Sequence, residues 1–400
     1  MNIYEYQAKA LLKKFKINVP KGLIAYTPSE AKRAALKISS NGPWVLKAQI
    51  QAGARAKGHF LTRKKEKISG IEIVRNFGEV EHISAQMFGG MLKTPQTDKK
   101  GKLVSRVYIE AFEKIKKSFY LSFVVNRIAS CVTVLASRTT DDIVELAQKS
   151  PNAILRINLD LHHKIKEDDV LRLLSFLKLE KKYLPALKML VQNLHKAFVG
   201  LDATLLEINP VGLTQTGEFV ALDAKISFDN NALFRHPDIA GMRDDSVVGE
   251  NVIKAANCGF KYLEFEDGNI GLIVNGDGLA CAAEDYLEQM GEKVACSLNL
   301  KGGVDDQKIA DSLKIMMSNP KVEGIIINIL GGFLRCNLVA DGIIAAISDI
   351  GLNIPLVARF EGTNKQEAKE ILADHAVKVL TADTLQDAAV KLITAIKEGD

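Results

Sequence analysis

The 400-residue sequence predicts an α/β protein in which an α+β first half precedes a doubly wound parallel sheet. From Gly268 onward, five apolar runs alternate with helical patterns, as in a parallel sheet with both faces covered. The first 220 residues instead mix short strand-like runs with helices in no regular order. Residues 229–265 lack clear periodicity and contain Asn230-Asn231 and His236-Pro237, so they indicate a connection between two domains.

In the first half, a helix is expected directly after Asn2, which can cap it with Glu5 three positions on. Ala8, Leu11 and Leu12 then fall on one face of that helix. Further helical patterns lie near residues 28–38, 141–149 and 168–200. Strand-like runs lie at residues 44–50, 106–110, 120–125, 132–136, 205–208 and 219–223.

In the second half, the expected strands are residues 270–274, 293–298, 322–330, 354–360 and 377–380. Helical patterns fill the gaps, at about 277–290, 305–318, 333–349, 365–374 and 384–397. Because crossovers between parallel strands are right-handed, this order predicts a doubly wound, flavodoxin-like domain. We expect domains at 1–235 and 266–400, joined by residues 236–265.

The composition excludes several classes of protein. Hydrophobic residues make up 47% and charged residues 25%, the balance of a globular enzyme, and no apolar stretch is long enough to span a membrane. The net charge of +5 is small, and a solvated face explains the lysine clusters near 63–67, 99–102 and 114–117 better than a nucleic-acid patch. The N-terminus lacks a signal-peptide pattern. Five cysteines without a CxxC pair favour a reducing compartment, the cytoplasm.

Two glycine-rich loops follow predicted strands of the second half. They are Asn275-Gly276-Asp277-Gly278 and Gly331-Gly332-Phe333-Leu334. Such loops expose backbone N–H groups at the positive end of a helix and so suit an anion. A tight strand-to-helix turn explains either loop equally well, and neither matches a P-loop or the GxGxxG fingerprint.

Polar residues in the first half suggest a metal and a phosphate. Glu207, Asn209 and Asp223 lie near strand ends, and an Asn–Asp pair supplies the oxygen ligands that Mg²⁺ prefers. The alternative is a hydrogen-bonded turn around Asn209-Pro210. Lys47 lies in an apolar strand and needs a partner, which is a phosphate, a carboxylate, or water at an edge strand.

No nucleophile motif accompanies these candidates. The sequence has no Gly-x-Ser-x-Gly elbow, no HExxH and no suitably spaced Cys/His pair. Anion sites without a nucleophile suggest that part of the active site lies on another chain.

The same segments resemble the β subunit of succinate–CoA ligase (succinyl-CoA synthetase) over nearly the whole chain. Eight segments in the same order carry the resemblance: residues 1–9, 44–49, 207–210, 222–225, 230–235, 274–280, 328–336 and 360–364. The resemblance implies an ATP-grasp domain followed by a CoA-ligase domain. It also implies a reversible reaction of succinyl-CoA, phosphate and ADP or GDP to succinate, CoA and ATP or GTP, in the tricarboxylic acid cycle.

The resemblance further implies a partner and a set of site residues. A histidine on a separate α subunit is phosphorylated in between, in an αβ or α₂β₂ assembly, and Glu207 orients that histidine. Asn209 and Asp223 hold Mg²⁺. The nucleotide contacts are Lys47, Ala54, Arg55, Ala56, Glu110, Glu113 and Ser118, and the succinate contacts at the α subunit are Asn275, Gly332, Phe333 and Leu334.

Several positions depart from the family pattern. Ala54 and Ala56 stand where the family has glycines over the nucleotide, and Ser118 stands where it has a glutamate. Two alternatives therefore stay open. One is a malate–CoA ligase β subunit, since related chains share the segment at 223–229. The other is a homologue with an impaired nucleotide site that acts as a binding partner of an α subunit.

Overall fold

The computed structural model describes residues 1–61, 68–159, 165–300, 305–332, 334–351, 353–375 and 379–399. The lysine cluster near 63–67 and Phe333 lie outside this part of the chain. The chain divides into two compact units, Met1–Arg243 and Asp244–Asp400. Each unit has its own core of buried apolar side chains.

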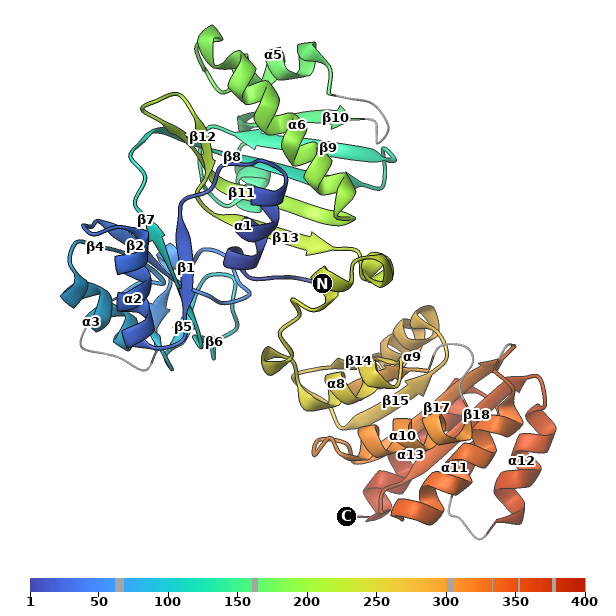
Figure 1. The fold of residues 1–400 in the computed structure, drawn as a ribbon. Helices are drawn as coiled ribbons and strands as arrows, with labels where there is room; N and C mark the ends of the chain where they lie inside the picture. The colour runs from blue at the N-terminus through green and yellow to red at the C-terminus, as the bar shows by residue number, and fades with distance from the viewer. Residues whose placement is uncertain are drawn as a thin grey trace. The chain divides into compact units, whose positions relative to one another are not determined.

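The first unit contains a four-stranded antiparallel sheet on which two helices pack (Figure 1). Its strand order is β1 (Gly22–Ala25), β7 (Val107–Ala111), β2 (Trp44–Ala48) and β4 (Ile71–Val74). The helices are α2 (Pro28–Ile38) and α3 (Phe77–Met87), and a small sheet of β3 (His59–Phe60), β5 (Met91–Lys93) and β6 (Lys102–Leu103) lies in the same unit. Thr27 and Asn76 cap the two helices with their side chains, which fixes where each begins.

A six-stranded sheet forms the rest of the first unit. Its order is β10 (Ile154–Leu159), β9 (Cys131–Ser137), β8 (Ile115–Asn126), β11 (Ala203–Thr214) and β12 (Phe219–Ala221), with β13 (Ala224–Phe228) also paired to β11. Helices α1 (Glu5–Lys14), α5 (Glu167–Phe176) and α6 (Leu184–Gly200) contribute to its core, while α4 (Ile143–Lys149) has no buried residue. The helical pattern at 168–200 is therefore two helices, divided where Lys178 takes φ 51°.

The expected cap of the first helix is wrong. Helix α1 begins at Glu5, and the N–H of Tyr4 before it donates to Gln7 Oε1 (2.9 Å). Asn2 instead pairs with Ser227, whose hydroxyl donates to Asn2 Oδ1 (2.7 Å). A long-range strand contact thus takes the side chain that a local capping pattern would use.

The second unit has the predicted doubly wound sheet. Strands β16 (Val294–Asn299), β15 (Ile270–Val274), β17 (Gly324–Gly331), β18 (Leu356–Gly362) and β19 (Val379–Ala382) are parallel, in the flavodoxin-like order 2-1-3-4-5. Helices α9 (Asp277–Gln289) and α13 (Leu385–Gly399) cover one face. The other face is covered by α10 (Asp306–Met317), α11 (Cys336–Ile350) and α12 (Lys365–Asp374), which lie side by side (Figure 1).

Residues 229–265 are more regular than their sequence indicates. They contain the short helix α7 (Pro237–Ala240), helix α8 (Glu250–Asn257) and strand β14 (Lys261–Glu264), which is antiparallel to β16. The last two belong to the second unit, since the division falls at Arg243 and Asp244. Short elements of one or two turns carry too few apolar repeats to be read from periodicity.

Across the described ranges, none of the helices combines the length and the apolar character needed to cross a membrane.

Candidate functional site

Six charged side chains from distant parts of the first unit meet at one place. We call this group the charge cluster: Glu5 and Lys9 of α1, Lys47 of β2, Arg55 of the short 3₁₀ helix η1 (Arg55–Lys57), Glu110 of β7, and Asp223 between β12 and β13. Five of them are buried, and the side chain of Asp223 is 28% exposed. Three carboxylates and three cations give a formal charge of zero.

Glu5 is the centre of the charge cluster. Its Oε1 accepts from the ammonium groups of Lys9 and Lys47, both at 2.8 Å, and its Oε2 accepts from Arg55 Nη2 at 2.7 Å. Burial opposes ionisation of Glu5, but Lys47, Lys9 and Arg55 outweigh that effect and hold the pKa of Glu5 well below its ordinary value. Glu5 is therefore a carboxylate at neutral pH.

Lys47 is held by more than one partner. Its ammonium donates to Glu110 Oε2 (2.6 Å) and also to the carbonyl of Leu222, which Lys9 shares. Burial disfavours the charge on Lys47, but Glu5 and the other nearby carboxylates outweigh it and raise the pKa of Lys47. Strand β2 lies between β7 and β4, so the reading of Lys47 as a solvated edge-strand residue is wrong.

Arg55 joins the charge cluster to the candidate metal ligands. Its Nη2 contacts Asp223 Oδ2 at 2.7 Å as well as Glu5, and its Nη1 donates to the Ala48 carbonyl (3.0 Å). Burial works against the charge, yet Asp223 and Glu5 raise the pKa of Arg55 above its already high value. Arg55 therefore stays protonated and forms an ion pair with Asp223.

Asn209 lies opposite Asp223 in the antiparallel pair of β11 and β13. Ile208 pairs with Ala224, and the N–H of Leu222 donates to the Pro210 carbonyl (3.0 Å), which places Asn209 and Asp223 across from each other. Strand β11 continues through Asn209-Pro210, so the alternative of a turn there is wrong. Asn209 Oδ1 is buried and accepts no hydrogen bond from the residues that the structure describes. A buried carboxamide oxygen without a donor beside a carboxylate fits a Mg²⁺ ligand pair.

The loop at Gly53–Lys57 is held at its first residue by Gln96. The N–H of Gly53 donates to Gln96 Oε1 (2.9 Å), and Gln96 Nε2 donates to Asp142, the N-cap of α4. Ala54 takes φ 57° and ψ 30°, the left-handed region that favours glycine, whereas Ala56 lies inside η1. The two alanines are therefore not equivalent in conformation.

The remaining candidates of the first unit are Glu207, Glu113 and Ser118. Glu207 is on β11, opposite Ser122 and Lys225, and burial with Asp223 and Asp142 raises its pKa, although Lys225 acts in the opposite direction. Glu113 follows β7, and burial together with Glu110 raises its pKa. Ser118 is exposed on β8.

The two glycine-rich loops of the second unit are joined by one side chain. Asn275 Nδ2 donates to the Leu330 carbonyl (2.7 Å), and the N–H of Leu330 donates to Asn275 Oδ1 (3.0 Å). The side chain of Leu334 is buried. Helix α11 begins at Cys336 rather than near Gly332, because the Cys336 N–H donates to Thr363 (3.0 Å) and Arg335 takes the cap position.

A solved structure shares the fold of the whole chain. ATP citrate lyase from Methanothrix soehngenii, in complex with citrate and coenzyme A, superposes with a TM-score of 0.76 over 99% of each chain. The identity is 15%, so this likeness shows the fold alone.

Family models and sequence relatives are more specific. A model described as an ATP-grasp domain matches residues 2–213, and one described as CoA-ligase matches residues 273–393. The succinate–CoA ligase [ADP-forming] subunit beta of Acidiphilium cryptum is 42% identical over 401 residues, and those of Paramagnetospirillum magneticum and Rhodospirillum rubrum are 41% identical over 401 residues. Each comparison covers 100% of both chains.

This chain belongs to the family of succinate–CoA ligase β subunits. Its members are ligases, ATP-grasp enzymes in general use ATP or ADP with Mg²⁺, and a β subunit implies an α subunit. The structure brings Lys47, Arg55, Glu110 and Asp223 of this β subunit into one cluster of ion pairs, with Asn209 opposite Asp223 in the sheet.

Sequence reasoning missed Glu5 and Lys9 of this β subunit. Glu5 was read as the capping partner of Asn2 and Lys9 was given no role, yet both lie on the buried face of the helix with Ala8 and Leu12. A single charged side chain is rarely buried. An acidic residue and a lysine four positions apart on the apolar side of a helix therefore indicate a buried ion pair. That spacing is the signal that would have found them.

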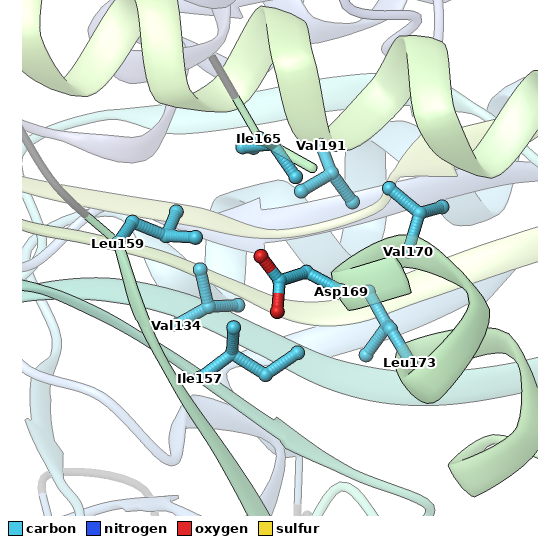
Figure 2. A pocket seen from close by; sticks show the side chains of 8 residues that line it. All are labelled: Val134, Ile157, Leu159, Ile165, Asp169, Val170, Leu173 and Val191. Atoms are coloured by element: carbon cyan, nitrogen blue, oxygen red, sulfur yellow. The ribbon is translucent and has the colours of Figure 1, made fainter. Parts of the chain in front are cut away.

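The cavity in Figure 2 is separate from these candidates. Its volume is about 10 Å³, room for one water molecule at most, and seven apolar side chains line it. The Asp169 carboxylate also borders it, and its Oδ1 lies 3.5 Å from Arg172. Leu159 and Ile165, which adjoin the undescribed residues 160–164, are part of its wall, so we assign it no role in the β subunit.

Proposed function

We propose that this chain is the nucleotide-binding β subunit of an ADP-forming or GDP-forming succinate–CoA ligase. With its α subunit it interconverts succinyl-CoA, phosphate and ADP with succinate, CoA and ATP, and the phosphoryl group passes through a histidine of the α subunit. The names of the full-length relatives support succinate as the acid and ADP as the nucleotide. Five free cysteines support a reducing compartment, the cytoplasm.

The observation that carries the proposal is that cations suited to phosphate and oxygen ligands suited to Mg²⁺ meet in the first unit. Arg55 Nη2 is 2.7 Å from Asp223, which stands opposite Asn209 in the sheet, and Lys47 meets the same group through Glu5. Phosphoryl transfer needs little covalent chemistry from a protein, because positioning and charge stabilisation dominate its catalysis.

Each of these residues has a defined task in the proposed reaction. Lys47 would bind a phosphate oxygen as a point charge, and Arg55 would bind two with its planar fork. Asn209 and Asp223 would hold Mg²⁺, which offsets the charge of the phosphates when it is bound. Glu110 keeps Lys47 in place, and Glu113 and Ser118 would contact the nucleotide at its ribose or base.

The remaining steps require the α subunit. We propose that Glu207 accepts a hydrogen bond from the α-subunit histidine and orients its ring for phosphoryl transfer. Asn275 and the backbone of Gly332 and Leu334 would bind succinate where the α subunit docks. Phe333 has the same proposed role from its sequence position. The internal hydrogen bonds of Asn275 keep the two loops together for that task.

The test is reconstitution. We expect no turnover of succinyl-CoA, phosphate and Mg·ADP by the purified chain and none by the α subunit, but ATP formation when the two are mixed. Turnover by the isolated chain would contradict the proposal, because it would require a nucleophile within this chain. The chromatographic mass of the active mixture separates αβ from α₂β₂, and a parallel titration with GDP gives the nucleotide preference.

Malate is tested in the same assay. The relatives reported above are named for succinate, and none of these names favours malate. We expect kcat/KM to be higher with succinyl-CoA than with malyl-CoA. The reverse order would reassign the acid substrate while leaving the nucleotide half of the proposal intact.

A further inference from the structure

We infer that Arg359, together with Asn328, binds the carboxylate of the acid substrate that is not joined to coenzyme A, and so selects a dicarboxylic acid over a monocarboxylic one. This role rests on the proposed function and deepens it, because it names the residues that recognise the far end of the acid. Both residues lie outside the set of succinate contacts proposed above.

Asn328 and Arg359 are neighbours near the carboxyl end of the parallel sheet. Asn328 of β17 pairs with Arg359 of β18 on one side and with Val274, the last residue of β15, on the other. Strands β15 and β17 lead into α9 and α11, which cover opposite faces of the sheet. Ligands of doubly wound folds bind in the crevice at such a topological switch point. The pair therefore lies where the fold favours a ligand.

The proposed succinate contacts begin close to this pair along the strands. Asn275 directly follows Val274, and its side chain bonds the backbone of Leu330, two residues beyond Asn328. Two residues of a strand span roughly 6.6 Å. That length is comparable with the separation of the outer oxygens in a four-carbon dicarboxylate, so one such molecule reaches from the Asn275 loop to Asn328 and Arg359.

The Asn328–Arg359 pair has hydrogen-bond donors to spare. Arg359 Nη1 donates to Asn328 Oδ1 (3.1 Å), while Asn328 Nδ2 and Arg359 Nε have no acceptor in the part of the chain that the structure describes. Asn328 is fully buried, and a buried donor without an acceptor is costly. The Nε and Nη2 groups of an arginine form one edge with two parallel N–H groups, which matches a carboxylate.

That edge of Arg359 can be approached from solvent. The side chain is 16% exposed, and Nη2 lies 3.7 Å from Glu361 Oε2, beyond a normal hydrogen bond. A carboxylate that binds Nη2 reaches Nε after a small rotation of the guanidinium. Such a bond is strong because both partners are charged and one side of the site is buried.

The charges around Arg359 leave a positive surplus. Lys365 contacts the same Glu361 oxygen at 3.0 Å, closer than Arg359 does. Lys365, more than Arg359, holds the pKa of Glu361 below its ordinary value. Two cations therefore share one carboxylate, which leaves a formal charge of +1. The second carboxylate of a dicarboxylic acid neutralises this charge, whereas the methyl end of a monocarboxylic acid does not.

The experiment measures binding of radiolabelled succinate and butyrate by equilibrium dialysis, using the full-length chain with its α subunit. Butyrate has the same four carbons and lacks the second carboxylate. The wild type should bind succinate at least about tenfold more tightly than butyrate. Arg359→Met should weaken succinate binding about tenfold to a hundredfold and leave butyrate binding unchanged. Arg359→Lys keeps the charge without the planar edge and should bind succinate with an intermediate affinity.

A second variant changes the affinity in the opposite direction. Glu361 is 47% exposed and competes with the substrate for Arg359. Glu361→Gln should therefore strengthen succinate binding about twofold to fivefold, the size of an exposed ion pair, and leave butyrate binding unchanged. Lys397→Met is the control, because Lys397 is exposed on α13 and its loss removes one positive charge from the same unit. It should change neither affinity.

Equal binding of succinate and butyrate by the wild type would overturn the inference, and this comparison needs no variant to fold. An equal loss of both ligands in Arg359→Met would also overturn it, because that result would assign Arg359 a structural role. So would an unchanged succinate affinity in Arg359→Met or in Glu361→Gln. Failure of the proposed function is seen separately, as absence of ATP formation in the reconstitution, because dialysis requires no turnover.

Discussion

Ala54 is one of the non-glycine residues that take a positive φ in the described part of the chain. Its φ of 57° and ψ of 30° lie in the left-handed region, where a Cβ atom costs roughly 1 kcal/mol or more. Ala56, two positions on, lies inside the 3₁₀ helix η1 and carries no such strain. A glycine would therefore relieve the backbone at position 54 and would relieve nothing at position 56.

We predict opposite effects for the two glycine substitutions. Ala54→Gly should raise the free energy of unfolding by about 0.5–1 kcal/mol, because it relieves the left-handed conformation. Ala56→Gly should lower it by about 0.5–1 kcal/mol, because glycine loses more entropy on folding. Urea unfolding of both variants measures the difference. Equal effects would show that Ala54 is not strained in solution.

At the scale of single elements, helix α1 does more than cover the sheet. Its apolar residues Leu11 and Leu12 belong to the core, while Glu5 and Lys9 on the same side reach the charge cluster. A helix with charged residues on its buried face is stable only if every charge has a partner. The position of α1 and the geometry of Lys47 and Arg55 are therefore linked.

This link predicts a large cost for removing the Lys9 ammonium. Lys9 is 1% exposed and its pKa is lowered by burial, but Glu5 and Glu110 both contact it. Lys9→Met keeps the length of the side chain and should destabilise the protein by about 3–5 kcal/mol, as expected when one member of a buried pair is lost. Lys13→Met, on the exposed side of α1, should change stability by no more than about 0.5 kcal/mol. Thermal unfolding of both variants tests this, and similar melting temperatures would contradict it.

A second element-scale contact depends on pH. Asp202, in the turn before β11, accepts from Arg235 Nη2 and His236 Nε2, both at 2.6 Å. These contacts, with Arg235 the stronger, lower the pKa of Asp202 to about 2. An acid whose pKa is lower in the folded state stabilises the protein at pH values above its unfolded pKa, about 3.9. That contribution to the free energy of unfolding is lost as the pH falls toward 2.

We predict that Asp202→Asn costs about 1 kcal/mol at pH 7, after allowing for the exposed Arg235. The difference from the wild type should shrink as the pH falls from about 4 toward 2, because Asp202 then becomes protonated in both states. Urea unfolding across this range measures it, with the exposed Asp98→Asn as a control. A difference that stays constant with pH would assign the effect to packing rather than charge.

Elements with long apolar repeats were predictable from the sequence, and the contacts between elements were not. The helix expected at 28–38 begins and ends at those residues, and all five parallel strands of the second unit are present. The start of α11 was placed too early, because its first free N–H is taken by Thr363. Lys47 was recognised as needing a partner. That this partner is Glu5 could not be predicted, because the contact arises from tertiary packing that periodicity does not encode.

At the scale of the whole molecule, the charge cluster lies entirely within one of the two units. All six of its residues, together with Glu207 and Asn209, fall inside Met1–Arg243, and the loops joined by Asn275 fall inside Asp244–Asp400. Resemblance assigned nucleotide and succinate residues to different halves of the chain. The division of the fold is consistent with that assignment, because each half buries its own core.

We therefore predict that each half keeps its own binding function when the two are produced as separate fragments. A fragment of residues 1–243 should bind Mg·ADP with an affinity close to that of the full chain, and a fragment of residues 244–400 should fold without binding it. Calorimetric titration of each fragment measures the affinity, and circular dichroism confirms that each is folded. Loss of ADP binding by a folded 1–243 fragment would mean that the second unit contributes to the nucleotide site.

The net formal charge of the charge cluster is zero, which also limits the substitutions that related chains can accept at these positions. Loss of one member leaves a buried charge without a partner, whereas joint loss of an acid and a base to apolar residues is often near neutral. Substitutions at these positions should therefore arise in pairs of opposite sign. Glu5 and Lys9 are the pair that can disappear together, since Lys47 would keep Glu110 and Arg55 would keep Asp223. A related chain that lost Glu5 and Lys9 together would then keep Lys47 and Arg55, each with a carboxylate partner.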